Sequence, residues 1–128
     1  MQIINMSKTK LNSLEPLILP KNVTSTECEL FKYPYYGKEK LLKKLHLTDG
    51  IIFANKLYTI EALNANKDSM PSNFVLPESL VSINKKIEAF TMKYIKGINL
   101  SVILNNPDIT YEEKIHYLKS IGRILEQM

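Results

Sequence analysis

The stretch SLVSINKKIEAFTMKYI, residues 79–95, decides the fold of this chain. β-Branched and aromatic residues dominate both of its halves, and a polar break at 84–86 separates them. An extended, apolar lead-in precedes the first half, and Gly97 follows the second. The pattern predicts a β-hairpin with strands over 74–83 and 87–95.

Upstream of this hairpin, the sequence predicts one strand and two helices. Residues 28–33 alternate as a strand does, whereas residues 37–47 are rich in lysine and place their leucines on one side of a helix. A longer helix over 49–66 has Asp49 as its cap and apolar residues at spacings of three and four. Residues 1–27 carry the weakest pattern of the chain.

Downstream of the hairpin, two further helices are predicted. A short helix begins near Leu100 and stops before Pro107, and Thr110 with Glu113 forms a capping box for a helix that runs to the end of the sequence. One face of this last helix is strongly apolar, and such a face usually packs on more protein. We therefore expect that the chain is cut short and that a further lobe or a partner covers the 110–128 helix.

The composition is that of one globular domain. Of the 128 residues, 45% are apolar and 23% are charged. No apolar run approaches the roughly 20 residues of a membrane span, and the first residues contain no stretch of signal-peptide length. The single cysteine, Cys28, excludes an internal disulfide and a multi-cysteine zinc site. We expect a cytoplasmic protein with no membrane partner.

The net charge of +4 is concentrated in one region, between Lys38 and Lys44. A patch of this kind suits nucleic acid or a phosphorylated ligand, and a solvated lysine-rich surface is the other interpretation. The only arginine is Arg123, and arginine is the usual residue for bidentate contacts with phosphates and bases. The charge pattern therefore disfavours nucleic acid as a partner.

Together, these elements predict an α+β fold: a small antiparallel sheet with one long packed helix, followed by two helices. The stretch MKYIKGINL, residues 92–100, places an apolar residue, a polar residue, Tyr and an apolar residue ahead of Gly97. This stretch and the order of elements resemble the N-terminal lobe of the protein kinase-like superfamily, in a divergent form similar to bacterial-type protein kinases and aminoglycoside phosphotransferases. The resemblance implies an N-lobe-like domain over 1–97 and the first helices of a C-terminal lobe over 98–128.

The resemblance implies ATP as the ligand. The carbonyl of Lys93 and the amide of Ile95 would pair with the edge of adenine, as neighbouring strands pair with each other, and Met92 would close the back of the pocket. Lys32 points away from its aromatic neighbours in the strand and corresponds to the phosphate-facing lysine of the family. An ordinary edge strand and a surface lysine are the simpler interpretations of the same residues.

The sequence departs from the family pattern at three places. Protein kinases pair their strand lysine with a glutamate on the next helix, but Lys56 occupies the matching position, which leaves Glu61 as the candidate ion-pair residue. No glycine-rich phosphate loop precedes Lys32. The catalytic aspartate and the magnesium ligands of the family lie beyond the long helix, whereas this sequence stops at Met128. We therefore assign no catalytic residue and expect Mg²⁺ only together with the missing lobe.

Two other functions remain open at this point. One is a non-catalytic interaction or regulatory domain, including a pseudokinase, which would use the lysine-rich surface or the last helix. The other is a nucleic-acid-binding module. The preferred hypothesis is the ATP-binding N-terminal part of a kinase-like phosphotransferase that is not catalytically complete by itself.

Overall fold

The chain folds into two units of different composition, one built on a sheet and one on helices. The computed structural model describes residues 1–18, 28–46 and 50–127. The first unit comprises Met1–Asp68 and Val75–Tyr94, and the second comprises Ser69–Phe74 and Ile95–Met128.

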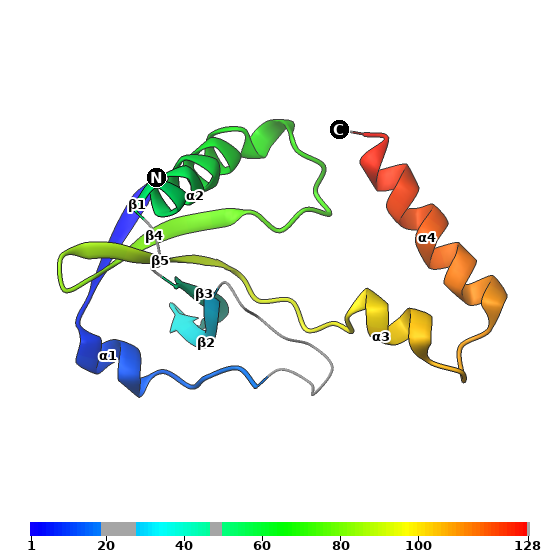
Figure 1. The fold of residues 1–128 in the computed structure, drawn as a ribbon, viewed down its shortest axis with the longest axis horizontal. Helices are drawn as coiled ribbons and strands as arrows, with labels where there is room; N and C mark the ends of the chain where they lie inside the picture. The colour runs from blue at the N-terminus through cyan, green and yellow to red at the C-terminus, as the bar shows by residue number, and fades with distance from the viewer. Residues whose placement is uncertain (19–27, 47–49, 128) are drawn as a thin grey trace. The chain divides into compact units, whose positions relative to one another are not determined.

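A mixed sheet organises the first unit (Figure 1). Among the described residues it has five strands in the order β1-β4-β5-β3-β2. The strands are β1 (Gln2–Met6), β2 (Cys28–Tyr35), β3 (Lys38–Leu45), β4 (Pro77–Ile83) and β5 (Lys86–Lys93). β1 lies parallel to β4, and the other neighbouring pairs are antiparallel. The predicted α+β fold is confirmed, and so is the predicted hairpin, which forms β4 and β5. The sheet was predicted to be antiparallel, and the parallel pairing of β1 with β4 corrects this.

Tight turns connect both hairpins of the sheet. Tyr36 and Gly37, with φ of 47° and 75°, join β2 to β3, and Asn84 and Lys85, with φ of 51° and 69°, join β4 to β5. Two consecutive left-handed residues make the turn whose twist matches that of the flanking strands. The predicted polar break is thus a two-residue turn.

The helix predicted over residues 37–47 is wrong, because this segment is strand β3. The strand is paired with β2 along one edge and with β5 along the other, and neighbouring leucines point to opposite faces of the sheet. Leu42 is fully buried on one face, and Leu45 is buried on the other. Leucines at positions 41, 42 and 45 fit one face of a helix, and they equally fit a strand that is buried on both faces. Pairing with β2 and β5 selects the strand.

One face of the sheet packs against the N-terminal segment. Helix α1 (Lys8–Ser13) is capped by Ser7, whose Oγ accepts a hydrogen bond from the amide of Lys10 at 3.1 Å. The residues that share this core are Met6, Leu11, Leu14, Tyr33, Leu42, Val81, Ile83 and Ala89. The weakly patterned N-terminus therefore supplies both a strand and a covering helix to the sheet.

Helix α2 (Gly50–Ala65) covers the other face (Figure 1). Its Ile60 is buried against Leu45 and Leu80, with Phe53 and Phe90 packed beside them. The long packed helix predicted over 49–66 is confirmed, and its predicted cap, Asp49, lies outside the described residues. A 3₁₀ turn, η1 (Lys67–Ser69), follows the helix.

Both helices of the second unit have side-chain caps. Asn99 Oδ1 accepts from the amide of Ser101 at 2.9 Å ahead of α3 (Leu100–Asn105). Thr110 Oγ1 accepts from the amide of Glu113 at 3.2 Å ahead of α4 (Tyr111–Leu125), as the capping sequence predicts. Within the described residues, none of the helices has the length and apolar character needed to cross a membrane.

Substitution of the central leucine of β3 should destabilise the first unit strongly. Leu42→Ala removes a side chain that is 0% exposed, so we expect a loss of about 2–5 kcal/mol in the free energy of unfolding, measured by urea titration. Tyr58→Ala, at a position 75% exposed on α2, is the control and should change stability by less than about 0.5 kcal/mol. Equal effects of the two substitutions would contradict the central role of β3.

Stability should also fall at alkaline pH because of Tyr33. Burial raises the pKa of Tyr33 above its ordinary value of 10.0, and the nearby Tyr35 and Tyr36 raise it further. The neutral phenol is thus favoured in the folded state, and its contribution, complete below pH 10, is lost as the pH rises through the folded-state pKa. Urea titrations above pH 10 should show a smaller loss for Tyr33→Phe than for the parent chain; identical losses would refute this assignment.

Candidate functional site

Several candidate residues share the sheet face that α2 covers. Side chains of residues directly paired across neighbouring strands point to the same face. Lys32 pairs with Leu41 and Leu41 with Met92, while Lys43 pairs with Phe90. Since Phe90 packs in the core beneath α2, this whole set faces the α2 side. The predicted orientation of Lys32, opposite to its aromatic neighbours, follows from the same alternation.

A cavity of about 400 Å³ lies between α2 and the sheet. Residues of β2, β3 and β5 line it on the sheet side, and residues 55–60 in the middle of α2 line it on the helix side. Its lining consists of Cys28, Lys43, Leu45, Asn55, Lys56, Thr59, Ile60 and Phe90. The volume is within the range that small ligands occupy in proteins.

Two lysines from two different elements line this cavity. Lys43 comes from β3 and Lys56 from α2, and both side chains are half-buried. Thr59 Oγ1 donates to the carbonyl of Asn55 at 3.0 Å, which holds the hydroxyl against its own helix. Among the described residues that line the cavity, there is no aspartate or glutamate. The charged side chains of the described lining are therefore both lysines.

Lys32 has a different environment. Its Nζ lies 3.5 Å from Oε1 of Glu15, and its amide donates to the Glu15 carbonyl at 2.9 Å. The segment containing Glu15 and Leu17 runs beside β2, so Lys32 is tied to the N-terminal part of the chain. Lys32 is not part of the cavity lining. Its role at a phosphate stays a prediction.

The other predicted residues are placed as follows. Met92 is half-buried near the end of β5, and Lys93 ends this strand opposite Lys40. Residues 94–99, which include Ile95, form neither helix nor strand. Glu61 is exposed on α2 and is not part of the cavity lining. The functional assignments of these residues stay predictions.

Lys43 is a candidate that the sequence analysis missed. The family resemblance places the phosphate-facing lysine on the strand directly before the helix, and that strand is β3 rather than β2. On β3, Lys43 is the lysine that shares a cavity with α2. The order of elements could have indicated Lys43. Residues 37–47 were predicted to be a helix, however, so no lysine of this segment was considered as a strand residue.

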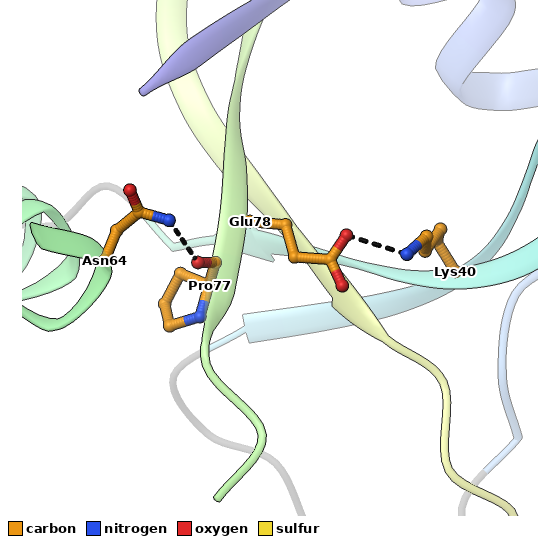
Figure 2. Close-up of polar contacts among 4 residues, drawn as sticks. All are labelled: Lys40, Asn64, Pro77 and Glu78. Carbon is orange, nitrogen blue, oxygen red and sulfur yellow. Dashed lines mark hydrogen bonds and ion pairs between the residues drawn. The ribbon is translucent and has the colours of Figure 1, made fainter. Parts of the chain in front are cut away.

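The start of β4 carries polar contacts on both of its sides (Figure 2). Asn64 Nδ2 of α2 donates to the carbonyl of Pro77 at 2.8 Å, and Lys40 Nζ lies 2.7 Å from Oε2 of Glu78. Alternation along β3 places Lys40 on the face opposite to Lys43. The lysine-rich region is therefore not one patch, because β3 divides its charges between two faces.

The bond from Asn64 should contribute to the attachment of α2. Asn64→Ala leaves the Pro77 carbonyl without this partly buried donor, and we expect a loss of about 1–2 kcal/mol in the free energy of unfolding. Glu61→Ala, an exposed substitution three residues earlier on the same helix, is the control and should cost less than about 0.5 kcal/mol. Urea titration measures the free energy of unfolding of both variants. An Asn64→Ala variant as stable as the parent chain would rule out this contribution.

The comparisons with known proteins rest on structure alone. No family model matches the sequence, and no curated protein matches it. The fold is similar to the apo structure of a pseudokinase, with a TM-score of 0.52 and 10% sequence identity. The match covers 84% of this chain and 42% of that chain, so this chain spans less than half of its neighbour's length. The fold is kinase-like.

Proposed function

We propose that this chain binds ATP as the N-terminal lobe of a kinase-like phosphotransferase. The observation that carries the proposal is that Lys43 of β3 lines one cavity together with residues of α2, the helix that follows this strand. A lysine at this place can neutralise and orient the phosphates of a nucleotide. The similarity of the fold to a pseudokinase supports the same assignment.

The adenine would bind at the end of β5. Residues 94–99 belong to no strand, so their main-chain groups lie outside the ladder of the sheet. In this proposal the Lys93 carbonyl and the Ile95 amide bind the purine edge, and Met92 closes the pocket behind it. Phosphoryl transfer additionally needs a catalytic base and magnesium ligands, and we assign none within this chain.

A second candidate function is that of a non-catalytic, regulatory kinase-like domain. The specific observation in its favour is Lys56, which lines the cavity where kinases place the glutamate partner of the strand lysine. Glu61, the acid considered for that role, is exposed. A cavity with two lysines cannot form the lysine–glutamate ion pair between these positions that active kinases use.

Titration of the labelled full chain with ATP tests the proposal. We expect amide chemical-shift changes centred on Lys93–Ile95, with a Kd that Lys43→Met raises about tenfold, because a charge-assisted hydrogen bond to phosphate is lost. Lys44→Met is the matched control, since its side chain faces the opposite side of β3 and the dissociation constant should not change. Lys32→Ala, measured alongside, decides whether β2 or β3 supplies the phosphate-facing lysine.

The absence of any shift at millimolar ATP would contradict nucleotide binding and favour a purely regulatory domain. Shifts confined to other parts of the chain would contradict the assignment of adenine to residues 93–95.

A further inference from the structure

We infer that another cavity, on the sheet face opposite to α2, binds a phosphate monoester group. Its lining consists of Lys8, Leu11, Lys44, Ile83, Asn84, Lys86 and Glu88, and we call it the lysine cavity. Its volume is about 230 Å³. The inference goes beyond the proposed function, because the phosphate-facing Lys43 of that proposal lies on the α2 side of the sheet and the lysine cavity lies on the α1 side.

Strand pairing places the lysine cavity on the α1 side. Lys44 of β3 is paired with Ala89 of β5, and paired residues share one face of a sheet. Ala89 belongs to the core that contains Leu11 of α1, whereas Lys43 faces α2. The lysine cavity therefore lies between α1 and the sheet, entirely within the first unit.

A β-bulge in β5 brings Lys86 to the same side. The register of β4 with β5 shifts at 81–82, which leaves Glu88 without a partner in β4. Uninterrupted alternation from Ala89 would turn Lys86 toward α2. Because of the bulge, Lys86 is instead paired with Ile83, which belongs to the core on the α1 side.

A backbone contact brings Lys8 to the same place. The amide of Asn84, in the turn between β4 and β5, donates to the carbonyl of Met6 at the end of β1 at 3.3 Å. Ser7 follows directly and caps α1, whose first residue is Lys8. Lysines from three separate elements, together with Asn84, thus line one cavity.

The charges of the lysine cavity favour a doubly charged anion. Three lysines against one glutamate give the described lining a net charge of +2. Within the part of the chain that the structure describes, the ion pairs involve other lysines, so no carboxylate lies at ion-pair distance from these three. Glu29, directly opposite Lys44, is exposed and is not among the described lining residues. A phosphate monoester carries a charge of about −1.5 to −2 at pH 7 and offers three acceptor oxygens, one for each ammonium group.

The size of the lysine cavity selects a compact group. Its volume of about 230 Å³ is below the roughly 300–1,000 Å³ of cavities that hold drug-sized ligands, so it fits a phosphate group rather than a whole nucleotide. Leu11 and Ile83 are buried, and next to such apolar side chains solvent screens charges less than in open water. The phosphate of a small molecule and that of a phosphorylated side chain share this chemistry.

Chemical-shift titration of the labelled full chain tests the lysine cavity. Millimolar inorganic phosphate and phosphoserine should shift the amides of Lys44, Asn84 and Lys86, whereas sodium chloride at equal ionic strength should not. Lys8→Met, Lys44→Met and Lys86→Met should each raise the Kd of inorganic phosphate about tenfold, because each removes a charge-assisted hydrogen bond. Lys8 and Lys86 are exposed, so their substitution should leave the fold intact.

The matched control is the neighbouring lysine of the same strand. Lys43→Met removes a charge from the α2 side and should leave the Kd of inorganic phosphate unchanged, while it weakens the ATP response at residues 93–95. Lys44→Met should have the opposite pair of effects. Lys44→Arg should retain most of the affinity for phosphate, which separates the effect of charge from an effect on folding.

The two responses fail independently. If inorganic phosphate shifts these amides no more than chloride does, or if Lys8→Met and Lys86→Met both leave its Kd unchanged, the phosphate site is wrong, and the proposed function still rests on the ATP response at residues 93–95. If phosphate binds and ATP leaves residues 93–95 unshifted, the proposed function is wrong and the phosphate site stands.

A phosphoserine peptide, titrated alongside, distinguishes the two sources of the group. Tighter binding of the peptide than of free phosphoserine supports the site and identifies a phosphorylated side chain as its ligand. Equal affinity supports the site and identifies a small phosphorylated molecule.

Discussion

The burial of β3 on both faces is the constraint on which the first unit depends. This strand is hydrogen-bonded to β2 along one edge and to β5 along the other, and each of its two faces contributes to a separate hydrophobic core. Leu42 anchors one core and Leu45 the other. A strand in this position must place apolar side chains on both faces of the sheet. Its lysines occupy other positions of the strand, so the position of each lysine determines the face on which its charge lies.

The lysines of β3 take their different environments from this alternation. Lys40 faces away from α2 and pairs with Glu78 at the start of β4, whereas Lys43 faces α2 and shares a cavity with Lys56. One short lysine-rich segment thus contributes to an ion pair on one face and to the lining of a cavity on the other. Because the alternation of the strand divides these lysines between two faces, the total charge of the region describes neither face.

The second unit poses a separate question. Its helix α4 is capped as the sequence predicts, and Leu118, Ile121 and Leu125 are 48%, 38% and 54% exposed. The expectation that more protein covers this helix stays a prediction. The pseudokinase to which the fold is similar is more than twice as long as the region that this chain matches.

The sequence alone determined the elements whose signals are local. The hairpin of β4 and β5, the long helix α2 and the cap of α4 follow from alternation, apolar spacing and a Thr-x-x-Glu motif, which neighbouring residues specify among themselves. Tertiary structure decided the rest. Residues 38–45 are compatible with a helix until β2 and β5 pair with them, and β1 forms only because β4 offers it a parallel edge. The candidate site shows the same division. The side of the strand on which Lys32 lies could be predicted from its neighbours. That Lys43 and Lys56 line one cavity could not, because these residues come together only once the helix packs on the sheet.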